Sequence, residues 1–291
     1  MFKPMKVLAL KDALKLKTPK THGNYYITEK KEGWFISIAY DHYIGEWSYP
    51  ISSAGNINLP LEHTIGLFEA LPRPHTSCVL IAEVIVEGLT FAILNGLLNR
   101  TTGNYRLDNP IFYFHNIYFP DAPHTSYQTR YHALQDLSEH FNKEYFRLLP
   151  ILHVGPYHLP TWQHYFEQIA NDGGEGIVCA RENHIYLPGK KTADLIKLKL
   201  ELTVDCLADR LEEGVGDKGY PSLTLVSKRK NGTEIRTVIG KHEDQDLFRA
   251  TPEAVIGKVV EIKAMESFAD GTLRQPVFKH IRLDKSIEDI D

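Results

Sequence analysis

Cysteine is scarce in this sequence, which has only Cys78, Cys179 and Cys206 among its 291 residues. The three are far apart and odd in number, which argues against a disulfide framework and against a cysteine-rich zinc site. The 14 histidines include no His-Glu-x-x-His motif, so the sequence does not support a catalytic metal held by histidine. Because free cysteines fit a reducing compartment, we expect a cytoplasmic protein.

Long hydrophobic runs are also missing. No window approaches 18 uncharged apolar residues, so we expect no membrane-spanning segment. The first residues, "MFKPMKVLALKDALKLK", place lysines inside every apolar stretch, which argues against a secretory signal. A hydrophobic content of 43% with 24% charged residues is typical of a soluble globular protein with one large domain or two smaller ones.

Positive charge is not in excess, since the formal net charge is −4. This value argues against a protein that coats nucleic acid through bulk electrostatics. Basic residues are nevertheless concentrated locally, in "GKKTADLIKLK" at 189–199, in "SKRK" at 227–230, and at Lys279, Arg282 and Lys285. Such local faces can bind phosphates, although a solvated loop is the simpler interpretation of "SKRK".

Two kinds of sequence pattern divide the chain near residue 201. Before this point, strand-like runs are expected at 25–30, 34–40 and 77–86, and helices at 61–71, 125–146 and 159–174. After it, short strands are expected at 202–208, 222–228, 233–240, 258–266 and 277–283, separated by turns. Short strands at this spacing are typical of a small barrel such as an OB-fold. We therefore predict an α+β protein with a larger domain over 1–200 and a compact β domain over 201–291.

Several lysines occur in strand-like surroundings. Lys30 lies in "EKKEG", beside Lys31, and a lysine becomes a nucleophile when burial and neighbouring positive charge remove its proton. Lys197 and Lys199 alternate with apolar residues, so on a strand both would project from one face and suit an anionic ligand such as a phosphate. The alternative interpretation is an edge strand that its lysines protect against aggregation.

Two acidic residues are as informative as the lysines. Glu83 lies inside the apolar run "VLIAEVIVEG", and buried acids are rare unless they are paired or bind a ligand. Glu175 follows two glycines in "GGEGIVCA", where the backbone can approach a ligand closely, although an ordinary helix-to-strand turn also fits. Two carboxylates facing lysines and a phosphate are what a divalent cation requires. The aromatic run at 111–119 is predicted as a core strand, from which one ring could stack on a base.

These features occur in a specific order: Lys-x-Glu-Gly, a buried Glu, an aromatic strand, Glu-Gly-Ile-Val, Lys-x-Lys, and a small barrel that ends in "IRLDK". In this order the chain resembles the covalent nucleotidyltransferases, and among them the ATP-dependent DNA ligases of the minimal, virus- or phage-like type. The resemblance extends from about residue 24 to 285. It implies an adenylation (nucleotidyltransferase) domain of antiparallel sheets and helices, followed by an OB-fold.

The resemblance implies a role for each matching residue of the first domain. Lys30 would attack the α-phosphate of ATP and form a lysyl-adenylate. The other residues would contact the nucleotide or its metal: Glu29 would bind the nucleotide, Glu83 would contact the ribose or the metal, Phe114 would stack on the adenine, Glu175 would help to hold the metal, and Lys197 and Lys199 would grip the α-phosphate.

In the second domain, Arg282, Asp284 and Lys285 of "IRLDK" resemble the motif that orients the leaving pyrophosphate. The implied cofactors are ATP, bound as covalent AMP, and Mg²⁺ or Mn²⁺. The implied partner is nicked duplex DNA, whose 5′-phosphate and 3′-hydroxyl ends are joined. A monomer in the cytoplasm, or in the host cytoplasm for a virus or phage, would bind DNA in a strongly salt-dependent way.

Four positions depart from the ligase pattern: Glu32 replaces an aspartate, Phe35 an arginine, Ser53 an arginine and His115 an aspartate. "EKKEG" also fits the looser Glu-Lys-x-x-Gly of RNA ligases, so an RNA ligase or another covalent nucleotidyltransferase, such as a capping guanylyltransferase, stays an alternative. A third possibility is a non-catalytic nucleic-acid binder that contains an OB-fold.

Overall fold

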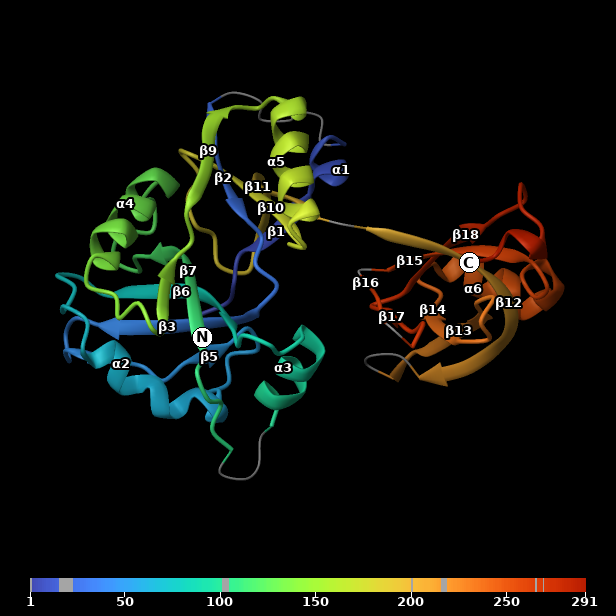
Figure 1. Ribbon diagram of the computed structural model, residues 1–291, viewed down its shortest axis with the longest axis horizontal. Coiled ribbons are helices and arrows are strands. Elements are labelled where there is room, and N and C mark those ends of the chain that lie inside the picture. The colour runs from blue at the N-terminus through green and yellow to red at the C-terminus, as the bar shows by residue number, and fades with distance from the viewer. Residues whose placement is uncertain are drawn as a thin grey trace. The chain divides into compact units, whose positions relative to one another are not determined.

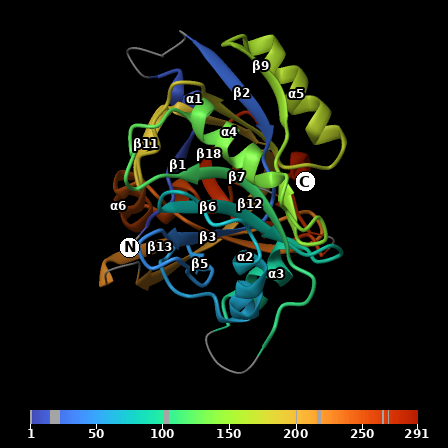
Figure 2. The ribbon, with the colours of Figure 1, turned by 90° about the vertical axis from the view of Figure 1, so that its left-hand side faces the viewer.

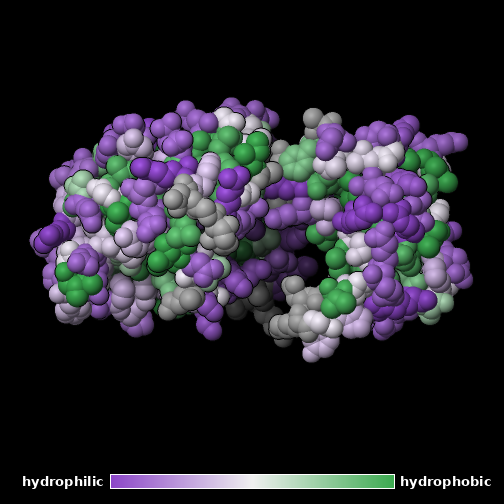
Figure 3. All heavy atoms as spheres, turned by 90° about the horizontal axis from the view of Figure 1, so that it is seen from below, coloured by the Kyte–Doolittle hydropathy of each residue, from purple (hydrophilic) through white to green (hydrophobic). Residues whose placement is uncertain are grey.

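The computed structural model describes residues 2–15, 23–100, 105–199, 201–215, 219–264, 266–268 and 270–291. The chain divides into two compact units, unit 1 over residues 1–199 and unit 2 over residues 200–291. The face drawn in Figure 3 is mainly hydrophilic on both units, with apolar residues scattered among the polar ones. None of the helices that the structure describes is long and apolar enough to cross a membrane.

Unit 1 is built on two β-sheets (Figure 1). The first sheet has the order β1-β11-β10-β2-β9, and its strands are β1 (Lys6–Ala9), β2 (Asn24–Glu29), β9 (Ile151–Pro156), β10 (Gly176–Arg181) and β11 (Lys191–Lys199). The second sheet has the order β4-β3-β6-β7-β8, with β5 paired to β3, and its strands are β3 (Trp34–Asp41), β4 (Glu46–Trp47), β5 (Ile51–Ser52), β6 (Cys78–Ile85), β7 (Ile111–Tyr118) and β8 (Phe146–Leu148). The pairs β1–β11 and β7–β8 are parallel, and the other pairs of unit 1 are antiparallel.

Helices cover the sheets of unit 1 (Figure 2). They are α1 (Leu10–Ala13), η1 (Leu59–Thr64), α2 (Ile65–Glu69), α3 (Phe91–Leu98), α4 (Tyr127–Ser138) and α5 (Leu159–Asn171). Helix α4 packs on β7, and its N-cap is Ser126, whose hydroxyl accepts a hydrogen bond from the Thr129 amide at 3.2 Å. It ends at Ser138, so the prediction of one helix over 125–146 is wrong at its carboxyl end, where Phe146 already begins β8.

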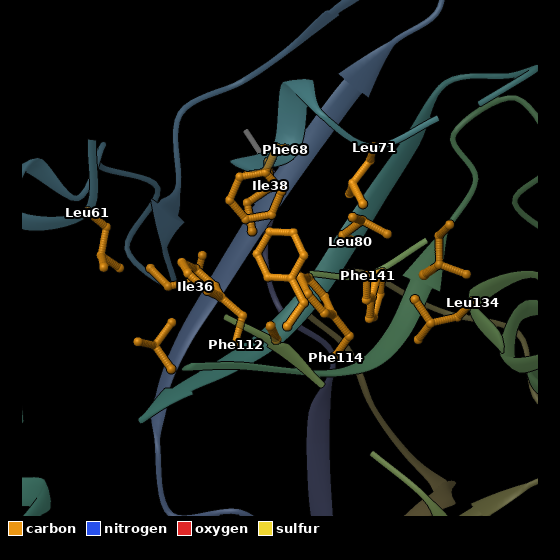
Figure 4. Packing of buried hydrophobic residues seen from close by; sticks show 14 of the residues in the cluster. Ile36, Ile38, Leu61, Phe68, Leu71, Leu80, Phe112, Phe114, Leu134 and Phe141 are labelled. Atoms are coloured by element: carbon orange, nitrogen blue, oxygen red, sulfur yellow. The ribbon is translucent and has the colours of Figure 1, made fainter. Parts of the chain in front are cut away.

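Strand alternation distributes the apolar side chains of unit 1 among three clusters. On one face of the second sheet, Phe68, Leu80, Phe112 and Phe114 form the largest cluster (Figure 4). On the opposite face, Val79 and Ile81 of β6 join Tyr26, Ala180 and Leu195 of the first sheet, so this cluster packs the two sheets together. The far side of the first sheet is covered by Trp162 of α5. Residues of odd number on β6 therefore face the first sheet.

Unit 2 is an antiparallel sheet with one covering helix. The strand order is β14-β13-β12-β15-β18, and the elements are β12 (Leu202–Val215), β13 (Pro221–Lys228), β14 (Glu234–Val238), α6 (His242–Ala250), η3 (Pro252–Ala254), β15 (Val259–Ala264), β16 (Glu266–Ser267), β17 (Leu273–Arg274), β18 (Val277–Ile281) and η4 (Ile287–Asp289). Strand β12 is bulged between Ala208 and Arg210, which helps a long strand to curve. Phe248 of α6 closes the core. The predicted α+β class is confirmed.

All three cysteines are buried and unpaired. Cys78 lies in the large cluster of the second sheet, and Cys179 lies in the cluster beneath α5. Cys206 lies in the core of unit 2. The cysteines therefore fill space as small apolar side chains.

Candidate active site

A cavity opens in unit 1 between its two sheets. Its non-aromatic polar and charged lining residues come from β2, β6, β7 and the segment after β2, and they are Thr28, Glu29, Lys30, Lys31, Glu83, His115 and Asn116. Aromatic rings of Phe35, Tyr113, Tyr127 and Tyr186 also line it. A concave site with an apolar wall and a few convergent charged groups is the usual form of a small-molecule site.

Lys30 is held directly beside Glu175. Its backbone amide donates a hydrogen bond to the Gly176 carbonyl at 2.8 Å, which continues the β2–β10 ladder beyond the Glu29–Ile177 pair. Its Nζ lies 2.6 Å from Oε2 of Glu175, whose side chain is only 9% exposed. Residues far apart in the sequence, in "EKKEG" and "GGEG", therefore meet because β2 and β10 pair.

Two glycines permit this arrangement by close backbone approach. Gly176 has a φ of +145°, and a Cβ there would lie 2.2 Å from the Leu198 carbonyl oxygen of β11. A Cβ on Gly33 would lie 2.9 Å from both the Cβ of Glu83 and the Val84 carbonyl oxygen. Only glycine fits either position without displacing backbone.

Lys197 and Lys199 of β11 lie opposite Val178 and Gly176 of β10. Val178 lines the cavity, and residues in register on adjacent strands project to the same face, so both lysines point toward the cavity side. Burial lowers the pKa of both lysines, and the charges of Lys199, Lys30 and Lys191 lower that of Lys197 further. Strand β11 lies between β1 and β10, so the edge-strand interpretation is wrong.

Glu83 approaches Lys30 from the second sheet. It stands on β6 between Phe35 of β3 and Tyr113 of β7, on the face turned to the first sheet. Burial raises the pKa of Glu83 to about 8, the charge of Lys30 lowers it, and the charge of Glu175 raises it. The mutual effects indicate that the two carboxylates and Lys30 form one electrostatic cluster.

This cluster could hold a magnesium ion that arrives together with phosphate groups. Among the residues that the structure describes, no group of three or more histidine, cysteine, aspartate or glutamate side chains could hold a metal ion by itself. Mg²⁺ usually binds proteins through one or two carboxylates together with substrate phosphates and water. Glu83 and Glu175 meet that requirement. When bound, the ion would neutralise charge on a phosphate group.

The residue predicted to stack on a base, Phe114, is not among those that line the cavity. Phe114 is 0% exposed and packs in the large cluster against Phe141 and Phe146, at ring-centroid distances of 5.1 and 5.3 Å (Figure 4). Its neighbour Tyr113 lines the cavity instead, with Nζ of Lys31 5.0 Å from its ring centroid. Successive side chains of β7 point to opposite faces of the sheet, so Phe114 and Tyr113 cannot both face the cavity.

Two of the four unusual positions lie in the cavity wall. Phe35 and His115 both line the cavity, and burial together with the charge of Lys30 lowers the pKa of His115 to about 4. His115 is therefore neutral at pH 7, whereas an aspartate at this position would be an anion. Ser53 is exposed in the turn after β5 and is not among the residues that line the cavity.

In unit 2, Arg282 and Lys285 are paired with acids of the same unit. Nη1 of Arg282 lies 3.2 Å from Asp205, and its Nη2 lies 2.7 Å from Asp284. Lys285 Nζ also contacts Asp205, which is 6% exposed. Both cations are thus held close together by one buried carboxylate.

A buried polar network that the sequence patterns did not reveal lies beside the cavity. Arg130 of α4 is 1% exposed and donates hydrogen bonds to Asn116 and to the carbonyl of His184. The centroids of the Tyr127 and Tyr186 rings each lie 5.7 Å from its guanidinium carbon. One signal was available in the sequence: Arg130 interrupts the apolar stripe of α4, where a charged residue is out of place.

His184 in this network makes the stability of unit 1 sensitive to acid. Its Nδ1 faces the Ile185 carbonyl at 2.9 Å and its Nε2 faces Arg130 at 3.4 Å, so the neutral ring donates to one and accepts from the other. Burial and the charge of Arg130 lower its pKa to about 4. The unfolded chain, with a histidine pKa near 6.5, binds more protons between these values, so stability is lost as pH falls.

We expect the free energy of unfolding to fall by about 2 kcal/mol more in the wild type than in His184→Gln between pH 7.5 and 5. Urea unfolding curves at both pH values measure this difference. Parallel losses in the two proteins would contradict a neutral, buried His184.

Comparison with known proteins places the fold. No protein-family model and no curated protein matches the chain. A solved structure named Pmar-Lig_PreS3 matches 97% of this chain and 68% of its own, with a TM-score of 0.74 and 18% identity. A structure from work on DNA binding by Lig E DNA ligases matches 97% of this chain and 100% of its own, with a TM-score of 0.71 and 18% identity.

The ATP-dependent DNA ligase of bacteriophage T7, in complex with ATP, matches 96% of this chain and 98% of its own, with a TM-score of 0.54 and 18% identity. At this identity the likeness is one of fold. The chain has the two-part fold of ATP-dependent DNA ligases, a nucleotidyltransferase unit followed by an OB-fold unit, and the predicted fold is confirmed.

Proposed function

We propose that the protein is an ATP-dependent DNA ligase that uses Lys30 as its nucleophile. Nζ of Lys30 attacks the α-phosphorus of ATP, the bond to the β-phosphate oxygen breaks, and pyrophosphate leaves. AMP then passes from Lys30 to the 5′-phosphate of a nick, and the 3′-hydroxyl displaces AMP to form the phosphodiester. The observation that carries this proposal is a cavity lysine flanked by two carboxylates within a ligase fold.

The surroundings of Lys30 support its role as nucleophile. Glu175, in contact with Nζ, is positioned to accept its proton, because an ammonium group has no lone pair with which to attack. Lys197 and Lys199 approach the same cluster from β11, where they would bind the α-phosphate and stabilise its developing charge. Lys31 is less suited, because its Nζ pairs with Glu29 and lies over the Tyr113 ring. Lys30 instead belongs to the cluster that contains Glu83 and Glu175.

We assign the remaining roles by chemistry. Tyr113 offers the ring on which the base would stack, in place of Phe114. Glu29 and Glu83 would contact the nucleotide, and Glu83 and Glu175 would hold Mg²⁺ once the phosphates are present. Arg282 and Lys285 would orient the leaving pyrophosphate after exchanging Asp205 for phosphate oxygens.

The proposed partner is nicked duplex DNA, bound by a monomer. An exposed basic cluster of unit 1, formed by Lys3, Lys6, Lys190 and Lys191, suits its phosphate backbone. Strand β1 pairs Lys6 with Lys191, and the Gly189 amide contacts the Lys3 carbonyl at 3.2 Å, so the backbone brings the four together. Within the described part of the chain, none of the four forms an ion pair.

Removing charge from this cluster is expected to change the salt dependence of DNA binding. Each lysine that neutralises a phosphate contributes about −0.9 to the slope of log K against log salt. The variant Lys6→Gln/Lys191→Gln should therefore flatten this slope by nearly 2, with adenylation unaffected. Fluorescence anisotropy of a nicked duplex from low to moderate salt measures it.

The control is Lys143→Gln, which removes an exposed lysine of unit 1 outside the cluster and should leave the slope unchanged. A double variant with the wild-type slope would show that the cluster does not touch DNA.

Intact mass spectrometry tests the proposed function. Incubation with ATP and Mg²⁺ should add the mass of one AMP, and nicked DNA should then remove it and be sealed. Labelling by GTP but not ATP would point to a guanylyltransferase and overturn the proposal. Sealing of nicked RNA but not of nicked DNA would assign the protein to the RNA ligases.

A further inference from the structure

The side-chain amide of Asn116 has a defined orientation beside the cavity. Its Oδ1 lies 3.0 Å from the Ile117 backbone nitrogen and 3.0 Å from Nε of Arg130. Both neighbours are donors, so the atom between them must be the carbonyl oxygen. Rotating the amide by 180° would bring its NH₂ group against two N–H donors. The geometry therefore directs the oxygen of Asn116 toward Arg130 and the NH₂ group away from it.

Arg130 cannot relax this arrangement, because its other donors are also occupied. Nη1 donates to the Thr125 carbonyl at 2.5 Å and to the His184 carbonyl at 3.1 Å, and Nη2 faces Nε2 of His184 at 3.4 Å. Among the residues described here, it contacts no carboxylate at ion-pair distance. A buried cation at the oxygen of Asn116 also polarises the amide, which strengthens its N–H groups as donors.

The NH₂ group of Asn116 is available to a ligand. Nδ2 forms no hydrogen bond with any described residue, yet it is not among the unpartnered atoms that are sealed from solvent. Since Asn116 is 4% exposed and lines the cavity, the accessible part of its side chain opens into the cavity. The cavity thus presents a fixed donor whose own oxygen is already used.

A base is the part of a nucleotide that fits this portion of the cavity. The phosphates belong near Lys30, Glu83 and Glu175, where the charges are gathered. Tyr127 and Tyr186 line the cavity and flank the guanidinium that holds Asn116. Aromatic rings beside a single oriented polar group are typical of a site for a flat heterocycle.

We propose that Asn116 donates a hydrogen bond to a ring nitrogen of the adenine of ATP, and that Arg130 is the positioning residue that orients it. The inference rests on the proposed function, since it requires the nucleotide in this cavity. Adenine offers N1, N3 and N7 as acceptors, whereas guanine carries a proton on N1. Because the NH₂ group of Asn116 can only donate, it favours a purine whose facing ring nitrogen is an acceptor.

Deaza analogues of ATP test this proposal, because each replaces one ring nitrogen with a C–H group. The rate of lysyl-nucleotide formation, as kcat/KM, is measured with ATP and with 1-deaza-, 3-deaza- and 7-deaza-ATP. One analogue should react about tenfold more slowly than ATP with the wild type, the effect of one lost hydrogen bond in a buried site.

The variant Asn116→Asp keeps the size of the side chain and an oxygen for Arg130 but removes both N–H donors. It should lose about tenfold with ATP and lose nothing further with the sensitive analogue, since the same hydrogen bond is absent in both. The variant Arg130→Lys should reduce the preference for ATP over that analogue without removing it. The proposal would be overturned if the loss of kcat/KM from Asn116→Asp and the loss from each analogue simply multiplied when combined. It would also be overturned if the wild type used all three analogues as efficiently as it uses ATP.

The control is Asn99→Asp, the same change at an exposed residue of unit 1, which should alter no ratio. If Asn116→Asp does not fold, the wild-type comparison of the analogues still decides. Equilibrium binding of AMP and its deaza forms separates the two proposals. Binding with the Asn116-dependent pattern but no covalent label would refute the ligase and keep the adenine contact. Covalent labelling in which the losses from Asn116→Asp and from the analogue multiply would keep the ligase and refute the adenine contact.

Discussion

A Lys30→Ala protein is expected to form no lysyl-AMP, with adenylation reduced by more than about a thousandfold. The neighbouring residue provides a matched control. Lys31→Ala removes the same charge one position away, from a side chain that pairs with Glu29 rather than Glu175, and should keep most of the activity. Intact mass after incubation with ATP and Mg²⁺ measures both variants.

The reason for this difference is geometric. The backbone of Lys30 is anchored to Gly176, so its Nζ lies beside the carboxylate of Glu175. Lys31 projects over the Tyr113 ring. Adenylation of Lys30→Ala at the wild-type rate would refute the assignment and make Lys31 the candidate. Loss of adenylation in both variants, with both proteins folded, would mean that Lys31 is also essential.

Alanine substitutions at two adjacent positions of β7 should affect different properties, one the stability and the other the nucleotide affinity. Phe114→Ala removes a fully buried ring from the large cluster and should lower the free energy of unfolding by about 3–5 kcal/mol. Tyr113→Ala should change stability little but weaken nucleotide binding about tenfold, since a stacked base contributes about 1–3 kcal/mol. Urea unfolding and the KM for ATP measure the two effects.

Tyr113→Phe is the control for this pair, because it keeps the ring and should retain nucleotide affinity. The opposite pattern, a stable Phe114→Ala with weak ATP binding, would restore Phe114 as the stacking residue. It would also require β7 to present its other face to the cavity.

The sequence was sufficient to predict most of the fold and the main charged cluster. Glu83 was identifiable because an acid inside an apolar strand needs a partner, and the structure gives it Lys30 as a neighbour. The five strands predicted between residues 202 and 283 were visible from alternation between turn residues, and they form the sheet of unit 2. These features depend on local patterns, which a single sequence contains.

The rest depended on pairing that the sequence does not state. In the run at 111–119, aromatic or apolar residues fall at both odd and even positions. Alternation alone therefore cannot say whether Tyr113 or Phe114 faces the ligand. The bulge opposite Ile81 and Ala82 shifts the register by a further residue at His115. Arg130 and His184 belong to segments 54 positions apart, and only the fold brings them together.

The buried cysteines make the two units separately observable. Burial raises the pKa of Cys78 and of Cys206 to about 12, so neither thiol is ionised at neutral pH. A thiol reagent can modify either one only when the surrounding core opens. The rate at which each cysteine is modified therefore measures how often one unit opens. Cys78 reports the opening of unit 1, and Cys206 reports the opening of unit 2. Bound nucleotide should slow the modification of Cys78, and this change would report occupancy of the cavity without any need for catalysis.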